Sequence, residues 1–441
     1  MPNRDRLAAP GRLPGPEGFD AILRWLITFS CGIYPDKVLN DTVKQGALVD
    51  GFGSSPPAKP TGFLDLLPQP ARERRRLEGT ILATMDAWGY DVIGTPSVEL
   101  LSTVELGVQP EQLQRLFKFS DADGRLLALV GERTVSAARV AAGQLRHEDR
   151  PLRLCYVGPT FLGTPPPGAP REAYQAGAEL IGAGSAAADA EVVAMAISAL
   201  EACGVRDFQV EVGHVGFFGG IMARLSVGHR AQVRDALAGR DLVGLEQALS
   251  ETDLRGPEQE LLLRFPALRG GPEILEAAGG LVGNPESAQA LEELAEVHRL
   301  LRAHGVDERV NLDLGAVRDF DYYTGVILEV FAPGVGVPLA TGGRYDGLLR
   351  RFGQDQPATG VVVFLDRVQP LVEDRTATGR PGSVLVGYSA DAEAAVRLSS
   401  RLRAAGARVV MEVNPSTMAQ LERRAATLGA ARVLLADEAG P

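Results

Sequence analysis

Apolar and polar residues alternate in several short stretches of the chain. Val310, Leu312 and Leu314 are separated by polar residues, and this period of two predicts a half-buried strand. Similar apolar stretches place strands at 152–158, 172–181, 208–212 and 326–331 and a hairpin at 117–119 and 126–130. Helices are expected at 77–88, where apolar residues recur about every 3.6 positions, and at 134–146 and 192–202. Strands of antiparallel type with helices between them indicate an α+β fold.

The spacing of apolar residues changes character along the chain, and these changes predict the domain boundaries. Residues 222–306 become helical and then return to a strand, so we expect a helical insertion in one large domain, 61–375. Asn284 followed by Pro285 is a favourable helix start. Residues 381–441 alternate strand, helix, strand, helix, strand, as in a small α/β unit. Residues 1–60 are rich in proline and glycine at both ends, and we expect a poorly ordered extension there.

Composition bears on whether the protein binds nucleic acid or metal, contains disulfides or spans a membrane. The 441 residues carry a formal charge of -11, which does not favour general affinity for nucleic acid. Three scattered cysteines and five histidines show no metal-ligand spacing, so neither a disulfide framework nor a metal site is expected. The apolar run 25–34 is too short to span a bilayer. These features predict a cytoplasmic protein.

One tract concentrates polar and aromatic residues between two apolar strands. Arg318, Asp319, Asp321, Tyr322 and Tyr323 lie between the strands expected at 310–314 and 326–331. Burying such groups is costly unless they pair with one another or bind something. The tract alone leaves two interpretations open, a mutually satisfied ion pair beside two core tyrosines or a ligand site.

The order and spacing of other segments favour a ligand site. They are LALVGERTVSAAR (127–139), the tract 153–182, ATGGRYDGLL (340–349) and ATGVVVFLDRV (358–368). With VRDFDYYTG at 317–325, they resemble the catalytic domain of class II histidyl-tRNA synthetases over about 61–372. They are still more similar to the non-catalytic relatives of these enzymes, the regulatory subunits of ATP phosphoribosyltransferase. The resemblance implies a class II synthetase-like antiparallel sheet with flanking helices and a dimer interface near Pro96.

The resemblance also implies a histidine pocket. Glu132 and Thr134 would hold the α-amino group, Arg318 would hold the carboxylate side, and Gln175 with Tyr322 would complete the pocket. Glu179 and Tyr323 would face the imidazole. A zwitterion needs opposite charges at its two ends, and an imidazole needs a partner on each nitrogen. Alternatively, these residues satisfy one another in a buried network.

The nucleotide half departs from the synthetase pattern. Leu162 stands where the synthetases have an arginine on the ATP phosphate, and the loop after it carries no basic residue before Arg171. Loss of one such donor costs roughly 100- to 1000-fold in rate. Arg367 matches the third-motif arginine, but Phe364 replaces a glycine that leaves room for adenine. We therefore expect no catalytic residues and no cofactor.

The resemblance implies a regulatory role in the first step of histidine biosynthesis. The chain would pair with a short-form catalytic subunit of ATP phosphoribosyltransferase, self-associate as a dimer within a hetero-oligomer, and take histidine as effector. Residues 381–441 resemble a truncated anticodon-binding domain, so tRNA binding is not expected. The alternatives are a histidyl-tRNA synthetase with an atypical ATP site and a stand-alone histidine-binding module.

Overall fold

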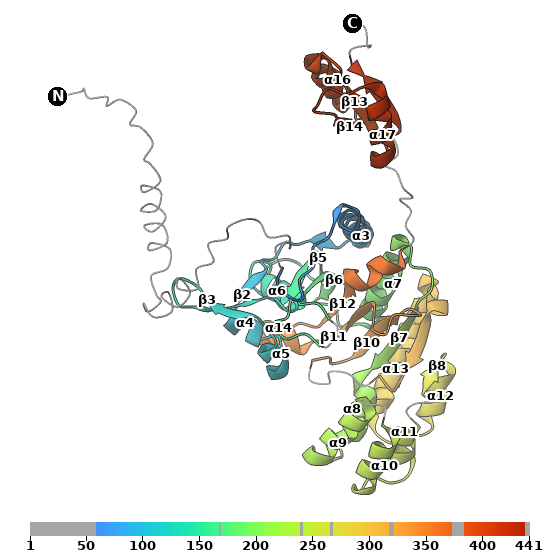
Figure 1. Cartoon of the computed structure of the whole chain (residues 1–441). Helices are drawn as coiled ribbons and strands as arrows, with labels where there is room; N and C mark the ends of the chain where they lie inside the picture. The colour runs from blue at the N-terminus through green and yellow to red at the C-terminus, as the bar shows by residue number, and fades with distance from the viewer. Residues whose placement is uncertain are drawn as a thin grey trace, which may run out of the picture. The chain divides into compact units, whose positions relative to one another are not determined.

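A nine-stranded sheet organises most of the chain (Figure 1). The computed structural model describes residues 59–166, 169–238, 241–264, 268–316, 322–372 and 383–436. In order across the sheet the strands are β1 (Asp91–Val92), β5 (Leu152–Phe161), β6 (Glu172–Ile181), β12 (Ala358–Phe364), β11 (Ala340–Arg344), β10 (Val326–Phe331), β7 (Gln209–His214), β9 (Val310–Asp313) and β8 (Arg269–Gly270). The sheet is that of the predicted α+β class.

Two pairs of neighbouring strands depart from the antiparallel expectation. β1 runs parallel to β5, and β9 runs parallel to β7. Parallel neighbours need a long crossover connection, and the helices between β7 and β9 supply one. The strand predicted at 310–314 is therefore present as β9, but its direction could not be inferred from its own residues.

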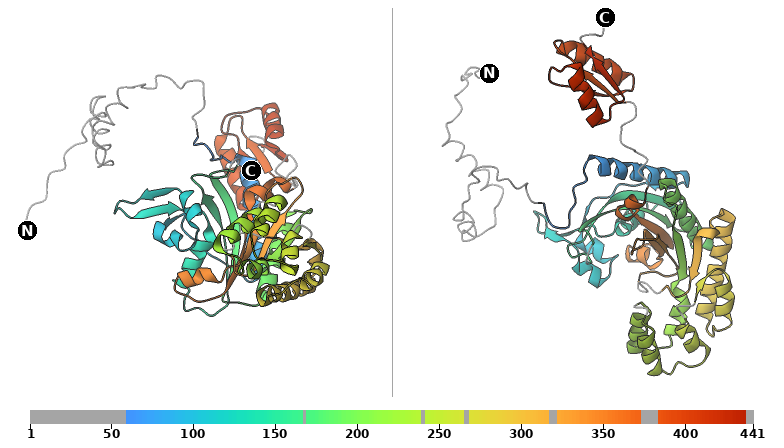
Figure 2. Two further views of the ribbon diagram at one scale, coloured as in Figure 1. Left: turned by 90° about the horizontal axis from the view of Figure 1, so that it is seen from below. Right: turned by 45° about the vertical axis from the view of Figure 1, so that its right-hand side comes forward.

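Helices cover the two faces of the sheet (Figure 2). The long helices α3 (Pro68–Ala87), α7 (Ala186–Cys203) and α13 (Pro285–His304) share one core with the apolar side of the strands. The opposite face packs against α6 (Arg133–Ala142) and α14 (Gly347–Arg351). Alternation along β6 divides the faces, because Ala176, Ala178 and Leu180 belong to the first core and Ile181 belongs to the second.

A smaller sheet contains the predicted hairpin. Its strands, in order, are β2 (Val98–Leu100), β4 (Leu126–Leu129) and β3 (Lys118–Ser120), and α4 (Leu101–Glu105) and α5 (Pro110–Gln114) lie between β2 and β3 in sequence. Asp121 accepts hydrogen bonds from the backbone of Asp123 and Arg125 at the turn. Gly124 has φ +77°, a conformation that glycine adopts without strain.

The region predicted to be a helical insertion is mostly helical, but it also contains the short strand β8, which joins the edge of the large sheet. Its elements are α8 (Val215–Met222), α9 (Val227–Ala238), α10 (Leu242–Ser250), α11 (Pro257–Leu263), α12 (Glu273–Gly279) and α13, with a short helix η2 (Asp307–Arg309) before β9. The Asn284 side chain accepts a hydrogen bond from the Ser287 amide at 2.8 Å, so the predicted cap of α13 is confirmed. Two other boundaries were misplaced, because α6 ends at Ala142 and β5 extends to Phe161.

The C-terminal residues form a three-stranded parallel sheet. The elements in sequence are β13 (Ser383–Gly387), α16 (Ala392–Ala404), β14 (Arg408–Met411), α17 (Met418–Leu428) and β15 (Arg432–Leu435), with β13 in the centre. Val384 and Val386 pack with α16, whereas Leu385 packs with α17. Residues 1–58, 373–382 and 437–441 lie outside the described residues, so the predicted extension and domain limits stay predictions. Over the described ranges, no helix has both the length and the apolar character needed to cross a membrane.

Candidate functional site

A small cavity lies on the face of the large sheet that α6 and α14 cover. Its lining residues are Glu132, Thr134, Glu179, Tyr322, Tyr323, Thr341, Gly342, Tyr345, Gly360, Val361 and Val362. They come from the start of α6, from β6, from the segment before β10, and from β11 and β12 with the turn between them. The cavity volume is about 30 Å³, enough for a water molecule. A ligand as large as an amino acid therefore requires lining side chains to move.

Glu179 is the central polar group of this cavity. It is 1 % exposed. Tyr156 donates a hydrogen bond to Glu179 Oε1 at 2.9 Å, and the Tyr345 hydroxyl donates to Oε2. Burial raises the pKa of Glu179 to about 7, although hydrogen bonds from Tyr345, Thr134 and Tyr156 act in the opposite direction. At neutral pH the carboxylate is thus poised between its ionised and protonated forms.

Glycines opposite Glu179 make room for its side chain. Gly360 on β12 is directly paired with Glu179 on β6, and Gly343 on β11 is paired with Gly360. A Cβ atom at position 360 would overlap Glu179 Oε2. A side chain at position 360 would therefore displace the Glu179 carboxylate, and one at position 343 would collide with the backbone of β10.

Tyrosine rings form another wall of the cavity. The rings of Tyr322 and Tyr323 meet edge to face at 5.0 Å between centroids, and Tyr322 stacks on Tyr345 at 5.7 Å. The buried Tyr322 hydroxyl has no hydrogen-bond partner among the described residues. An unsatisfied buried hydroxyl is unfavourable, so a polar ligand that reaches it would gain a hydrogen bond at no cost to an existing one.

A buried ion pair fixes the backbone next to Tyr345. Arg344 contacts Asp189 of α7 at 2.9 Å and also donates to the carbonyl oxygens of Ala183 and Ser185. Burial raises the pKa of Asp189 to about 6, while Arg344 lowers it. This ion pair ties the end of β11 to the start of α7, and so holds the turn that carries Tyr345.

The predicted site residues divide into three groups. Those that line the cavity together are Glu132, Thr134, Glu179, Tyr322 and Tyr323. Gln175 lies on the same face of β6 and is buried, but it does not line the cavity, and its Oε1 atom has no partner among the described residues. Arg318, Asp319 and Asp321 lie outside the described residues, so the ion pair considered for this tract stays a prediction.

Sequence reasoning missed Tyr156 and Tyr345 as part of the site. Tyr345 belongs to the quoted GGRYDG motif, but the motif does not show which carboxylate it contacts. Alternation along β5 puts Tyr156 on the face opposite to Cys155, yet only the pairing of Tyr156 with Gly177 brings it to Glu179. The alternation along β5 therefore indicates the face on which Tyr156 lies, but only the order and register of the strands show that it contacts Glu179.

The residues at the positions where the synthetase pattern places ATP contacts pack against other parts of the chain. The Arg367 guanidinium lies 3.8 Å from the centroid of the Phe364 ring and donates to the Pro338 carbonyl oxygen at 2.6 Å. Leu162 packs against an apolar cluster that contains Leu116 and Val135. Both positions are thus engaged in packing where the synthetase pattern would place groups that contact ATP.

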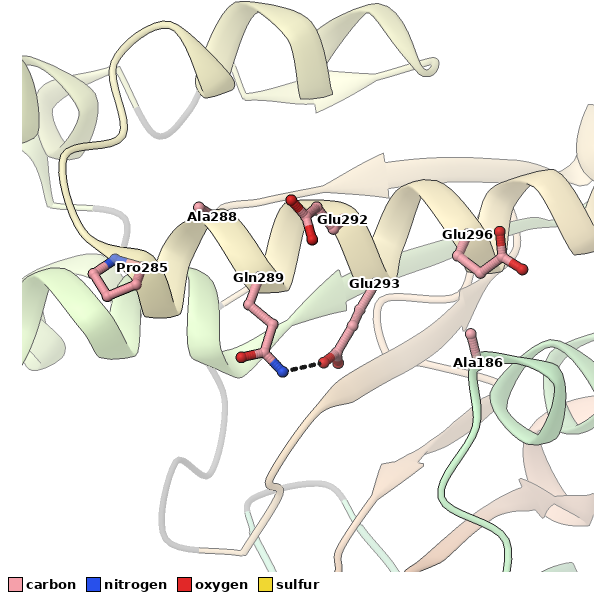
Figure 3. A pocket seen from close by; sticks show the side chains of 7 residues that line it. All are labelled: Ala186, Pro285, Ala288, Gln289, Glu292, Glu293 and Glu296. Atoms are coloured by element: carbon pink, nitrogen blue, oxygen red, sulfur yellow. Dashed lines mark hydrogen bonds between the residues drawn. The ribbon is translucent and has the colours of Figure 1, made fainter.

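A larger pocket of about 640 Å³ lies between the first turn of α7 and the exposed side of α13 (Figure 3). Ala186 faces Gln289, Glu292, Glu293 and Glu296 across it. Gln289 donates to Glu293 at 2.8 Å. The predicted site residues that the structure describes do not line this larger pocket. No group of three or more His, Cys, Asp or Glu side chains in the described part of the chain is placed to hold a metal ion.

Comparisons with known proteins agree with the architecture. The family model described as histidyl-tRNA synthetase matches residues 62–368. The chain is 39% identical over 376 residues to a protein of Moorella thermoacetica named ATP phosphoribosyltransferase regulatory subunit, covering 84% of this chain and 96% of that protein. A relative of the same name from Desulfitobacterium hafniense is 36% identical, with 86% of this chain and 97% of the relative covered.

Solved structures of similar proteins have the same overall architecture. A Bacillus halodurans protein titled ATP phosphoribosyltransferase regulatory subunit/histidyl-tRNA synthetase has a TM-score of 0.77 and 31% identity, with 86% of this chain and 97% of that chain covered. Histidyl-tRNA synthetase from Nostoc has a TM-score of 0.71 at 21% identity, over 86% of this chain and 92% of its own. The latter likeness concerns the fold alone.

Proposed function

Because the chain belongs to the family of ATP phosphoribosyltransferase regulatory subunits, we propose that it binds histidine in the cavity around Glu179 and reports its presence to a catalytic partner. The partner is a short-form ATP phosphoribosyltransferase, which joins ATP and phosphoribosyl pyrophosphate in the first step of histidine biosynthesis. This chain activates the partner and lowers its activity when histidine is abundant. Coupling of about 1–3 kcal/mol between effector and partner sites is sufficient.

The observation that carries the proposal is the chemistry of the cavity. Glu132 offers a carboxylate for an α-amino group, and Glu179 offers a buried acceptor for an imidazole N–H. The Tyr322 hydroxyl, which has no partner among the described residues, offers a further hydrogen bond. Arg318, which the family resemblance assigns to the carboxylate of histidine, supplies the opposite charge. This set of groups suits a small zwitterion with a polar ring.

We infer further that the chain does not itself aminoacylate tRNA. Arg367, which would hold the nucleotide in a synthetase, stacks on the Phe364 ring instead. Leu162 places a packed apolar side chain where a synthetase has the arginine that binds the ATP phosphate. A phosphate needs a positively charged or N–H donor. Leu162 offers none, and the Arg367 guanidinium is held by the Phe364 ring and the Pro338 carbonyl oxygen. The protein acts as a cytoplasmic dimer within a hetero-oligomer and does not bind tRNA.

Titration calorimetry of the purified protein with histidine, and separately with ATP, tests this function. Histidine is expected to bind and ATP is not. Co-purification with a short-form catalytic subunit, and inhibition of the joint activity by histidine, would support the regulatory role. Robust histidine-dependent pyrophosphate exchange would instead identify an active synthetase, and histidine binding without a catalytic partner would identify a stand-alone sensor.

A further inference from the structure

A chain of hydroxyl groups joins the two ends of the cavity. Thr134 Oγ1 lies 3.3 Å from the Tyr156 hydroxyl, which donates to Glu179 Oε1. The Tyr345 hydroxyl donates to the other oxygen of the same carboxylate. Thr134 is expected to face the amino group of the ligand and Glu179 its ring. Tyr156 therefore connects the groups that would recognise opposite parts of one molecule.

The strands are shaped to seat Tyr156 at this position. Tyr156 is 1 % exposed, and its partner across β5 and β6 is Gly177. A Cβ atom at position 177 would overlap the ring and hydroxyl of Tyr156. Glycine in the interior of a strand usually weakens it, so its presence here shows that the tyrosine ring needs the space.

Hydrogen bonds from Tyr156 and Tyr345 favour an acceptor role for the Glu179 carboxylate, whereas burial and the charge of Glu132 act in the opposite direction. Among the described residues, the titratable groups around Glu179 are Tyr156 from β5, Tyr345 after β11, Tyr322 and Tyr323 before β10, and Glu132 before α6. Burial raises the pKa of Tyr156, Tyr322 and Tyr345 well above the usual range. The tyrosines therefore remain protonated donors near neutral pH, and a carboxylate that receives two hydroxyl hydrogen bonds is favoured in its ionised form.

We infer that Tyr156 is a positioning residue, assisted by Tyr345, that fixes Glu179 as an ionised acceptor and so makes the cavity select amino acids whose side chain presents an N–H group. This inference rests on the proposed function, because it assumes that histidine enters the cavity. The inference adds a physical reason why the cavity would prefer histidine to amino acids that lack a side-chain N–H group. A ring without an N–H donor would leave the carboxylate buried and unpaired, which is strongly unfavourable.

The pH dependence of binding separates positioning from simple packing. Removing a hydroxyl that donates to the ionised form raises the pKa of a carboxyl group. Tyr156→Phe and Tyr345→Phe keep the rings but remove this donor. Binding to ionised Glu179 is lost as the pH falls through its pKa of about 7. In either variant the midpoint should move upward by about one pH unit, with about fivefold weaker binding at pH 7, because the ionised fraction of Glu179 there falls from about one half to about one tenth.

The experiment is calorimetric titration of the full-length protein between pH 5.5 and 8.5. The ligands are histidine and its 1,2,4-triazole analogue, whose ring stays neutral over this range and so leaves Glu179 as the titrating group. Tyr90→Phe is the matched control, because Tyr90 is equally buried and donates to Glu191 at 3.0 Å on the other face of the sheet. Its midpoint should equal that of the wild type. Thermal melting verifies that each variant is folded.

The possible outcomes distinguish this inference from the proposed function. Upward midpoint shifts in Tyr156→Phe or Tyr345→Phe, but not in Tyr90→Phe, support it. Wild-type midpoints in both pocket variants, with histidine still bound, overturn it and leave the proposed function standing. If the wild type itself binds no histidine at any pH, the proposed function fails, and the inference fails with it. If Tyr156→Phe does not fold, the midpoint of Tyr345→Phe decides the result.

Discussion

Glu179 is a buried carboxyl group that makes no ion pair with any described residue. Burial raises its pKa from 4.5 to about 7. Between these values the folded chain holds a proton that the unfolded chain releases. Stability therefore falls as the pH rises from about 4.5 to about 7. A carboxyl group that weakens the fold at neutral pH is best explained by a role in binding.

Glu179→Gln is expected to weaken histidine binding at least tenfold, because the amide cannot provide the ionised acceptor. The same change should remove a pH-dependent loss of unfolding free energy on the order of 3 kcal/mol between pH 4.5 and 7. Calorimetry and urea unfolding at several pH values measure the two effects. Glu296→Gln, at an exposed position of α13, is the control. Unchanged histidine affinity in Glu179→Gln would exclude this carboxylate from the site.

Arg318→Ala is expected to abolish histidine binding measured by calorimetry, because the carboxylate of the ligand would lose its only predicted cationic partner. Arg350→Ala is a suitable comparison, since Arg350 forms an exposed ion pair with Asp355 at 2.8 Å. Exposed pairs contribute about 0–1 kcal/mol, so this control should bind normally. Normal binding by Arg318→Ala as well would remove Arg318 from the proposed pocket.

At the scale of the element, β6 serves two cores at once. Ala176, Ala178 and Leu180 pack beneath the long helices, whereas Gly177 and Glu179 lie on the other face, where Glu179 lines the cavity. Its partners β5 and β12 place Tyr156 opposite Gly177, and Gly360 opposite Glu179. The period of two in a strand thus lets one side remain apolar while the other holds polar groups.

Gly177→Ala is expected to weaken histidine binding and lower the melting temperature, because the new methyl group would displace Tyr156 from Glu179. Overpacking of this kind typically costs about 1–3 kcal/mol. Gly79→Ala is the matched control, since no atom lies within 4 Å of a Cβ at this position in α3. Alanine there should be neutral or stabilising by about 0.5–1 kcal/mol. Equal effects of the two changes would contradict the packing argument.

At the scale of the whole molecule, the cavity is formed entirely by residues of the large-sheet region and by none of the C-terminal sheet. All of its lining residues lie between Glu132 and Val362. The C-terminal sheet has cores of its own, in which Val386 packs with Ala395, and Leu385 packs with Leu421. Histidine binding should therefore not require the C-terminal sheet.

A chain that ends at Val372 is expected to bind histidine within about threefold of the full-length affinity, since a difference of this size is below 1 kcal/mol. Calorimetry on both proteins measures it, with thermal melting to show that the shorter chain is folded. A loss of binding in a folded shorter chain would mean that the C-terminal residues complete the site.

Much of the fold could be predicted from local patterns. The strand at 326–331, the hairpin turn at Gly124 and the Asn284 cap follow from residues that are close in sequence. The parallel direction of β9 could not be predicted in this way, because it depends on the route of the chain through the helices that connect β7 to β9. The ends of α6 and β5 were also missed, since tertiary packing overrides propensity at element boundaries.

The sequence by itself determined the family, the α+β class and most residues of the candidate site, because motif spacing and hydrophobic period are properties of the chain. Only the tertiary structure decided that Tyr156 and Tyr345 share the Glu179 carboxylate, that Gln175 does not line the cavity, and that Arg367 stacks on Phe364. The reason is physical: these contacts join residues from different strands. Strand pairing and side-chain packing set their distances, and neither is encoded in local spacing.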